Sequence, residues 1–341
     1  MSVPKVMENI MQETIPWIEK YRPSSIDDVI MDDAVRAHVS FFLRKRENSH
    51  LIITGVPGIG KTSSVRGIAR ELLGTNMSSA YLELNAADDR GVRSIATIVP
   101  PFCKKKLATT TRIILLDEAD TMTIKCQYDI NSMIKDYGRK TRFIFTCNDS
   151  TKILKDIQSV CHIIRLKRLS DEQIKTYLSQ ICEKEGVPYN EEGLRMICYI
   201  SEGDMRKAIN NLQLTSFSFQ NVSKKNVLCS CKVPDPNDIN EVIQSCMIRD
   251  LVQADERLDK IIACGYYYLD IIKGFIFVLK KSDLNEALKL ELIKVITQTQ
   301  VTVSIGPRSK LQLSAMIARL ILVVKEKVKE KVVEKKEVAR I

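Results

Sequence analysis

The segment that most constrains the fold of this sequence is Gly55-Val56-Pro57-Gly58-Ile59-Gly60-Lys61-Thr62, which fits the pattern G-x-x-x-x-G-K-[ST]. An apolar run at 51–54 precedes it, and a helical pattern follows it. Backbone N–H groups in such a loop turn toward phosphate oxygens, and the helix N-terminus adds partial positive charge. The motif predicts a phosphate-binding loop between a buried strand and a helix, with Lys61 at the terminal phosphates and Thr62 as a Mg²⁺ ligand. The alternative is a glycine turn that happens to precede a helix.

A second apolar run ends in acidic residues. Ile113-Ile114-Leu115-Leu116 leads into Asp117-Glu118-Ala119-Asp120. Carboxylates at the end of a buried strand are costly to desolvate unless a cation lies beside them. We therefore expect Asp117 to hold Mg²⁺ through water, and Glu118 to polarise an attacking water as general base. A strand that simply leaves the sheet into a polar loop is the alternative.

Apolar runs alternate with helical patterns at 51–54, 81–84, 112–116 and 142–146, which is typical of βαβ units and a parallel sheet. The last run ends at Asn148, which we expect on the ligand side of the sheet. There its amide would orient the lytic water or sense the γ-phosphate. Asparagine is also common in turns, so this signal alone is weak.

Composition limits the class of protein without identifying it. The 341 residues include 52 Lys and Arg against 42 Asp and Glu, a net charge of +10, which permits a nucleic-acid partner. No apolar run approaches the ~20 residues of a membrane-spanning helix, and the first residues do not resemble a secretory signal. The ten cysteines lack the spacing of a disulfide scaffold and predict reduced thiols in an intracellular protein.

Changes of pattern along the chain predict its domains. Strand signals stop near residue 169, where Ser170 and Gln173 form a possible capping box, and Pro234-Asp235-Pro236 reads as a linker. We expect five parts, namely a lead-in at 1–14, an α/β domain at 15–168, helical domains at 169–233 and 234–324, and a charged tail at 325–341.

Several segments, in order, resemble the small subunits of replication factor C, the sliding-clamp loader of eukaryotes and archaea. The resemblance covers roughly residues 15 to 323 and is far more specific than the phosphate loop alone. Its motifs are Ile15-Pro16-Trp17-Ile18-Glu19-Lys20-Tyr21-Arg22-Pro23, Glu83-Leu84-Asn85-Ala86-Ala87-Asp88-Asp89-Arg90-Gly91, Asp117-Glu118-Ala119-Asp120, Ile157-Gln158-Ser159 and Gly203-Asp204-Met205-Arg206.

The resemblance implies an α/β AAA+ P-loop ATPase domain, a parallel sheet with flanking helices, followed by a small helical lid domain and a C-terminal all-α collar domain. It implies ATP and Mg²⁺ as cofactors. The implied partners are sibling subunits in a ring of five, a PCNA-like sliding clamp and primer–template DNA, with no membrane, in a nucleus or at a viral replication site. Two alternatives remain: an ATP-binding structural subunit that hydrolyses little, and another AAA+ DNA-remodelling ATPase.

The resemblance also assigns residues. Asn148 matches the sensor-1 position, Arg206 matches the sensor-2 arginine that touches the γ-phosphate, and Arg22 matches an arginine near the nucleotide. One position departs, because Val160 stands where the family carries a trans-acting arginine. We therefore expect a poor activator of the neighbouring subunit's site, unless Lys155 or Arg165 substitutes.

DNA contacts require cations, because they are made mainly to phosphates. The expected DNA-binding residues are Arg90 and Arg93, after a turn at 85–89, and Arg139 and Lys140, after a predicted helix at 124–136. Solvated surface charge is an equally good interpretation of each. The apolar stretch 95–102 is expected either at a clamp-facing edge or in a buried helix.

Overall fold

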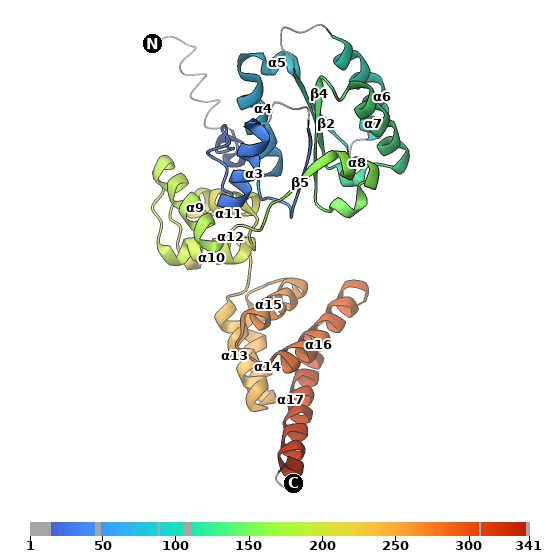
Figure 1. Cartoon of the computed structure of the whole chain (residues 1–341). Coiled ribbons are helices and arrows are strands. Elements are labelled where there is room, and N and C mark those ends of the chain that lie inside the picture. Colours follow the sequence, from blue (N-terminus) through green and yellow to red (C-terminus); the bar gives the residue numbers. More distant parts are fainter. Residues whose placement is uncertain (1–14, 45–48, 87–88, 106–110, 307, 339–341) are drawn as a thin grey trace, which may run out of the picture. The chain divides into compact units, whose positions relative to one another are not determined.

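The computed structural model describes residues 15–44, 49–86, 89–105, 111–306 and 308–338 (Figure 1). The chain divides into two compact units, Met1–Val227 and Leu228–Ile341. The boundary falls inside one helix, α12 (Lys224–Cys231), slightly before the proline-rich segment at 234–236. The predicted lead-in at 1–14 lies outside the described residues.

The first unit contains a five-stranded parallel sheet, as the alternating pattern predicts. The strand order is β2-β3-β4-β1-β5. The strands are β1 (His50–Thr54), β2 (Tyr81–Asn85), β3 (Arg112–Asp117), β4 (Thr141–Cys147) and β5 (Cys161–Arg165). Four of them match the apolar runs, whereas β5 was not predicted. It is an edge strand in which only Ile164 is buried, so its sequence carries little of the apolar signal of a central strand.

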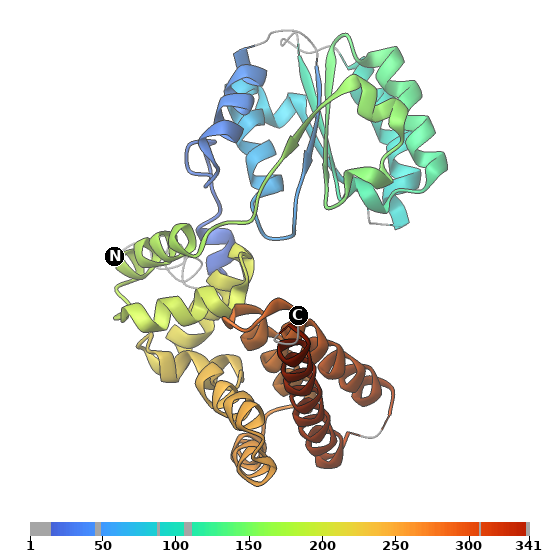
Figure 2. The same cartoon turned by 60° about the horizontal axis from the view of Figure 1, so that its bottom comes forward.

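Helices cover both faces of this sheet, and Figure 2 shows the sheet between the two layers. One core joins Ile113 and Leu115 to helices α3 (Asp33–Arg44) and α4 (Lys61–Leu73). The other core joins the alternate residues of β3 to α6 (Asp89–Lys104), α7 (Ile124–Tyr137) and α8 (Lys155–Val160). The remaining helical segments of this part are short: η1 (Gly74–Asn76), α5 (Met77–Ala80), η2 (Ala119–Thr121) and η3 (Ser150–Lys152). Successive side chains of a strand point to opposite faces, which explains why residues 113–116 of β3 are all apolar.

The described part of the first unit that follows the sheet is helical, and we refer to it as the lid. It consists of α9 (Asp171–Glu185), α10 (Glu191–Ser201), α11 (Met205–Phe219) and the start of α12. The predicted capping box is present, because Ser170 accepts from the N–H of Gln173 while the Gln173 side chain accepts from the N–H of Ser170. The short helix α2 (Trp17–Lys20), from the start of the described chain, packs its buried Trp17 on α11.

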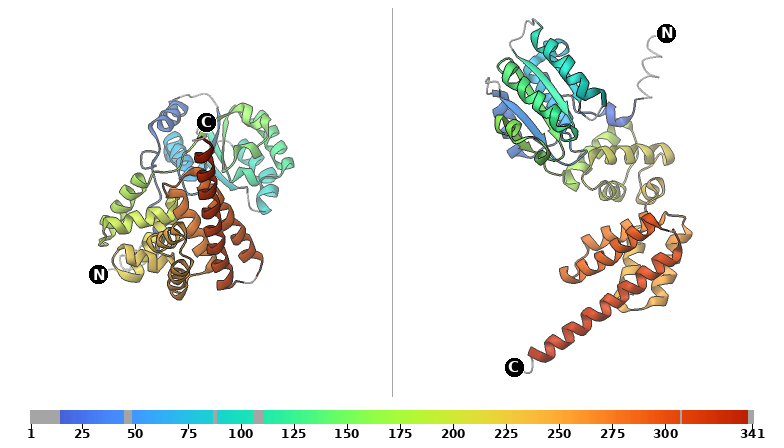
Figure 3. Two further views of the ribbon diagram at one scale, coloured as in Figure 1. Left: turned by 90° about the horizontal axis from the view of Figure 1, so that it is seen from below. Right: turned by 90° about the vertical axis from the view of Figure 1, so that its right-hand side faces the viewer.

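The second unit is entirely helical in its described part. It contains α13 (Pro236–Ile248), α14 (Leu251–Ala263), α15 (Tyr268–Lys281), α16 (Glu286–Ile305) and α17 (Lys310–Val338). Figure 3 shows α16 and α17 running side by side in this unit. Its core includes Phe275, Ile296 and Met316, all fully buried. The charged segment that begins at residue 325 continues α17. None of the described helices combines the length and hydrophobicity that crossing a membrane requires.

The packing of the second unit generates a stability prediction. Phe275 is fully buried on α15, so Phe275→Ala should lower the free energy of unfolding by about 3–5 kcal/mol through lost burial and a residual cavity. The matched control is Leu290→Ala on α16, whose side chain is 68% exposed and should cost less than about 0.5 kcal/mol. Chemical denaturation followed by circular dichroism measures both, and equal losses would contradict the assigned core.

Candidate nucleotide site

The glycine-rich loop connects β1 to α4 at the carboxyl end of the sheet, where the motif predicts it. Gly58 and Gly60 both have positive φ, 75° and 88°, which non-glycine residues rarely adopt. A Cβ on Gly58 would lie 1.8 Å from Oδ1 of Asp204, the residue that caps α11. The N–H of Met205 also donates to the carbonyl of Gly58 at 3.1 Å. The loop therefore touches the start of α11 directly, and only glycine leaves room for that contact.

Lys61 lies at the first position of α4 and folds back over the loop. Its ammonium donates to the carbonyl oxygens of Gly55 at 2.8 Å and Val56 at 2.9 Å, and to Oδ1 of Asn148 at 2.8 Å. Burial, together with the positive charge of Arg206, lowers the pKa of Lys61. A bound phosphate would oppose this effect, because anionic oxygens favour the charged form of the ammonium.

A hydroxyl and a carboxylate meet beside the loop. The Thr62 hydroxyl lies 3.0 and 3.2 Å from the two carboxylate oxygens of Asp117, which also accepts from the hydroxyl of Thr146. Such hard oxygen donors suit Mg²⁺, which usually keeps several waters and needs only one or two protein ligands. Accordingly, the described residues contain no cluster of three or more His, Cys, Asp or Glu that would form a full metal cage. The residues present fit the expected Mg²⁺ site.

Glu118 and Asn148 follow neighbouring strands, β3 and β4. Glu118 is exposed and has a left-handed backbone, φ 54°, while its N–H donates to Asp117 Oδ1 at 3.2 Å. Glu118 lines the same cavity as Lys61 and Asp117. Asn148 and Asp149 donate their N–H groups to Oδ2 of Asp120, at 3.3 and 3.4 Å.

Asp120 therefore holds the loop that carries Asn148, a role that the sequence reasoning did not assign. The buried Oδ1 of Asp120 has no hydrogen-bond partner within the described part of the chain. The sequence signal for Asp120 was its position in the acidic segment after β3. The sequence alone does not show which backbone N–H groups donate to its carboxylate.

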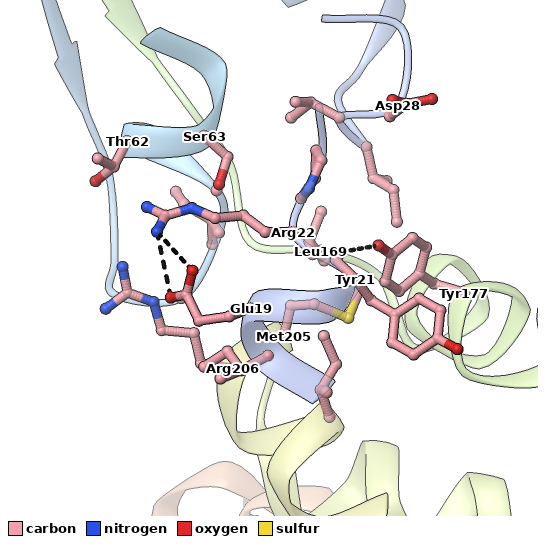
Figure 4. A pocket seen from close by; sticks show the side chains of 18 residues that line it. Glu19, Tyr21, Arg22, Asp28, Thr62, Ser63, Leu169, Tyr177, Met205 and Arg206 are labelled. Atoms are coloured by element: carbon pink, nitrogen blue, oxygen red, sulfur yellow. Dashed lines mark hydrogen bonds and ion pairs between the residues drawn. The ribbon is translucent and has the colours of Figure 1, made fainter. Parts of the chain in front are cut away.

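A cavity of about 280 Å³ opens on the other side of the loop, between Gly58 and Gly60, the segment before α3, and the lid. Figure 4 shows its lining, in which Arg22 and Arg206 come from opposite ends of the first unit's sequence. Arg206 also lines the smaller cavity around Lys61, Asp117 and Glu118. The structure thus brings both predicted arginines to the phosphate loop, with Arg206 reaching the two cavities.

A network that the sequence reasoning missed ties the start of the described chain to the lid. The Tyr177 hydroxyl donates to the carbonyl of Tyr21 at 2.5 Å, and the Tyr21 hydroxyl donates to Glu185. Lys20 pairs with Glu185 at 2.6 Å. Burial favours a raised pKa at Glu185, but the hydrogen bonds from Lys20 and Tyr21 outweigh it and lower that pKa. The residues lie more than a hundred positions apart, so no local pattern reveals the network.

The predicted DNA-binding residues are not gathered in one place. Arg139 and Lys140 are exposed and precede β4, so they lie at the amino end of the sheet, away from the phosphate loop. Arg90 and Arg93 belong to the first turns of α6, which follows the carboxyl end of β2, and their side chains lie outside the described part. Of the stretch 95–102, Ile95 and Val99 are buried within α6.

Val160 ends α8 and is 47% exposed, at the edge of the sheet next to β5. Lys155, at the start of α8, and Arg165, at the end of β5, are exposed as well. The position where the resemblance places a trans-acting arginine is therefore a surface position without charge.

Two family models match the chain. The model described as the ATPase family associated with various cellular activities (AAA) matches residues 51–169. The model of the replication factor C C-terminal domain matches residues 234–319. The two matches fall on the sheet-containing part of the first unit and on the helices of the second.

Curated relatives match over nearly the whole chain. A putative replication factor C small subunit of Acanthamoeba polyphaga mimivirus is 61% identical over 312 residues, 91% of this chain and 98% of that protein. Replication factor C subunit 4 of Saccharomyces cerevisiae is 36% identical over 92% of this chain and 98% of its own length. The small subunit of Archaeoglobus fulgidus is 32% identical over 89% of this chain and 96% of its own length.

Among solved structures, the RuvB Holliday junction branch migration motor of Thermotoga maritima is similar, with a TM-score of 0.50 and 17% identity. The match covers 66% of this chain and 78% of that one, and at this identity it shows the fold alone. The family, in contrast, is shown by the relatives and by the C-terminal domain model. The chain belongs to the replication factor C small subunits, within the AAA+ ATPases.

Proposed function

We propose that this chain binds ATP with Mg²⁺ and hydrolyses it as a subunit of a clamp loader in DNA replication. One observation carries the proposal: the carboxyl ends of β1, β3 and β4 place Lys61, Asp117 and Asn148 around one cavity, linked through Lys61 and Asn148 at 2.8 Å. Relatives of this chain are named replication factor C small subunit or replication factor C subunit 2, which supports a function in DNA replication.

Each residue of this cavity has a proposed role. Thr62 and Asp117 would hold Mg²⁺, and the bound ion would supply positive charge beside the phosphates. Lys61 turns from its carbonyl partners toward the terminal phosphates, and the loop N–H groups bind phosphate oxygens. Glu118, exposed beside Asp117, takes a proton from the attacking water as general base. Asn148 orients that water or contacts the γ-phosphate.

The arginines extend the site to the lid. Arg206 is the second residue of α11 and lines the cavity that contains Lys61 and Asp117, so its guanidinium is available to a terminal phosphate. Arg22 reaches the same loop from the segment before α3. Since arginine binds phosphate oxygens through a fixed fork, the two side chains would couple the lid position to the presence of nucleotide.

The wider assembly is part of the proposal. We infer a ring of five subunits in which the second unit serves as the collar, and which places a sliding clamp on primer–template DNA. The site of action is the nucleus or a viral replication site. The family membership supports this inference, and the net charge of +10 is compatible with a DNA partner.

Val160 favours an asymmetric role in this ring. An uncharged side chain cannot stabilise the phosphoryl group that transfers in a neighbour's site, and loss of an arginine finger costs about 10³–10⁵ in rate in related enzymes. We therefore propose that the chain hydrolyses ATP in its own site but activates its neighbour poorly. The missing charge at Val160 also supports the second candidate function, an ATP-binding structural subunit that hydrolyses little ATP.

Substitutions at two positions separate binding from hydrolysis. Lys61→Ala should weaken ATP binding by about tenfold or more through loss of charge-assisted hydrogen bonds, whereas Glu118→Gln should retain binding but slow hydrolysis by about 10²–10⁴-fold. Fluorescent-nucleotide titration and phosphate release measure the two effects. The matched control for Glu118 is Asp136→Asn, an exposed acid on α7 outside the site.

The same variants distinguish the enzyme from the structural subunit. In the reconstituted ring, Lys61→Ala in this chain should lower total ATP turnover. An unchanged turnover would contradict hydrolysis by this subunit and support the structural role.

Restoring the missing charge tests the asymmetric role. Val160→Arg should raise ATP turnover of the ring, by about tenfold if the restored arginine is well placed, because a cation then faces the neighbouring site. Val160→Ala should leave turnover unchanged. A large loss with Val160→Ala, or a loss with Lys155→Ala or Arg165→Ala, would show that an activating contact exists already.

A further inference from the structure

A carboxylate sits among the cations of the cavity beside the phosphate loop. Glu19, on α2, lines this cavity together with Arg22 and Arg206. Both oxygens of Glu19 accept from Nη1 of Arg22 at 3.3 Å (Figure 4). The Arg22 side chain is 23% exposed and the Glu19 side chain 56%, so the pair lies at the mouth of the cavity.

The position of Glu19 is fixed by its neighbours on α2 rather than by its own contacts. Trp17 is buried against α11. Its backbone N–H donates to Oε1 of Gln213 at 3.1 Å, and the centre of its ring lies 5.9 Å from that of Phe217. On the other flank, Lys20 and Tyr21 are held by Glu185 of α9. Glu19 is therefore presented to the cavity from a segment attached to the lid on both sides.

An acid at this place opposes the binding of an anion. The Glu19 carboxylate occupies Nη1 of Arg22, so it competes with phosphate oxygens for that nitrogen of the guanidinium. When a phosphate takes this nitrogen of Arg22, the carboxylate loses its partner, and the loss of that ion pair is subtracted from the free energy of nucleotide binding. Any nucleotide thus binds more weakly than it would to the same cavity without Glu19.

We propose that Glu19 is a positioning residue that holds Arg22 and competes with the nucleotide for it, thereby limiting nucleotide affinity and favouring product release. This inference rests on the proposed function of the site. An alternative is that Glu19 only stabilises α2 by its charge near the helix start, in which case its removal would loosen α2 and not tighten binding.

The test is Glu19→Gln, which keeps the shape of the side chain and removes its charge. The dissociation constants for ATP and ADP, measured by titration of fluorescent analogues with the full chain, should fall about fivefold, since an exposed ion pair is worth up to about 1 kcal/mol. ADP release in stopped flow should slow in proportion. The matched control is Asp27→Asn, an exposed acid paired with Arg36 at 3.1 Å outside this cavity, which should leave both constants unchanged.

A double-mutant cycle shows whether Glu19 acts through Arg22. In an Arg22→Gln background, Glu19→Gln should tighten binding by less than twofold. An equal gain in both backgrounds, or unchanged or weaker binding of Glu19→Gln alone, overturns the inference. If the unmodified chain binds neither ATP nor ADP, the proposed function fails as well, whereas binding by the unmodified chain with no gain in the variant removes only the role of Glu19.

Discussion

Parallel pairing of β1 with β4, and of β4 with β3, is the constraint on which the nucleotide site depends. It brings the ends of three strands to one edge, where the loop after β1 meets Asp117 and Asn148. Those strands are buried on both faces, by α3 and α4 on one side and by α6, α7 and α8 on the other, and this packing fixes where their ends lie. The polar side chains at the carboxyl ends of these strands then form hydrogen bonds with one another, as Lys61 does with Asn148 and Thr62 with Asp117.

A second constraint joins this edge to the lid. The close approach of Asp204 to Gly58 leaves no space for a side chain at position 58, and Arg206, two residues after Asp204, lines the cavity with Lys61 and Thr62. On the opposite side, Tyr177 and Glu185 hold the segment that carries Glu19 and Arg22. The cavity therefore has one wall from the sheet domain and one from the lid, and a change in either wall alters the cation arrangement between them.

Helices and strands with a strong local sequence pattern were predicted, whereas those with a weak pattern were missed. The central strands β1, β3 and β4 were predicted, because burial on both faces requires apolar side chains along the strand. The edge strand β2 was predicted from its run at 81–84, although its side chains are only partly buried and include Glu83. The edge strand β5 was missed, since most of its side chains are exposed and its pairing with β1 depends on residues far away in sequence. The Ser170 capping box was predicted because both partners lie within one helical turn. The predicted DNA-binding residues, chosen by charge alone, lie at two ends of the sheet.

The sequence by itself determined the phosphate loop, the acidic strand end and the family, because each rests on residues close together in the chain or on a series of motifs. It also determined that Val160 carries no charge. Only the tertiary structure decided that Asp120 holds the Asn148 loop, that Tyr21 is tied to α9, and that Glu19 faces Arg22 in the nucleotide cavity. The contacts of Asp120 and Tyr21 join segments that are far apart in the chain, so packing of the sheet and lid sets their geometry. Glu19 and Arg22 are only three residues apart, and for them the tertiary structure decided that the pair lines the nucleotide cavity.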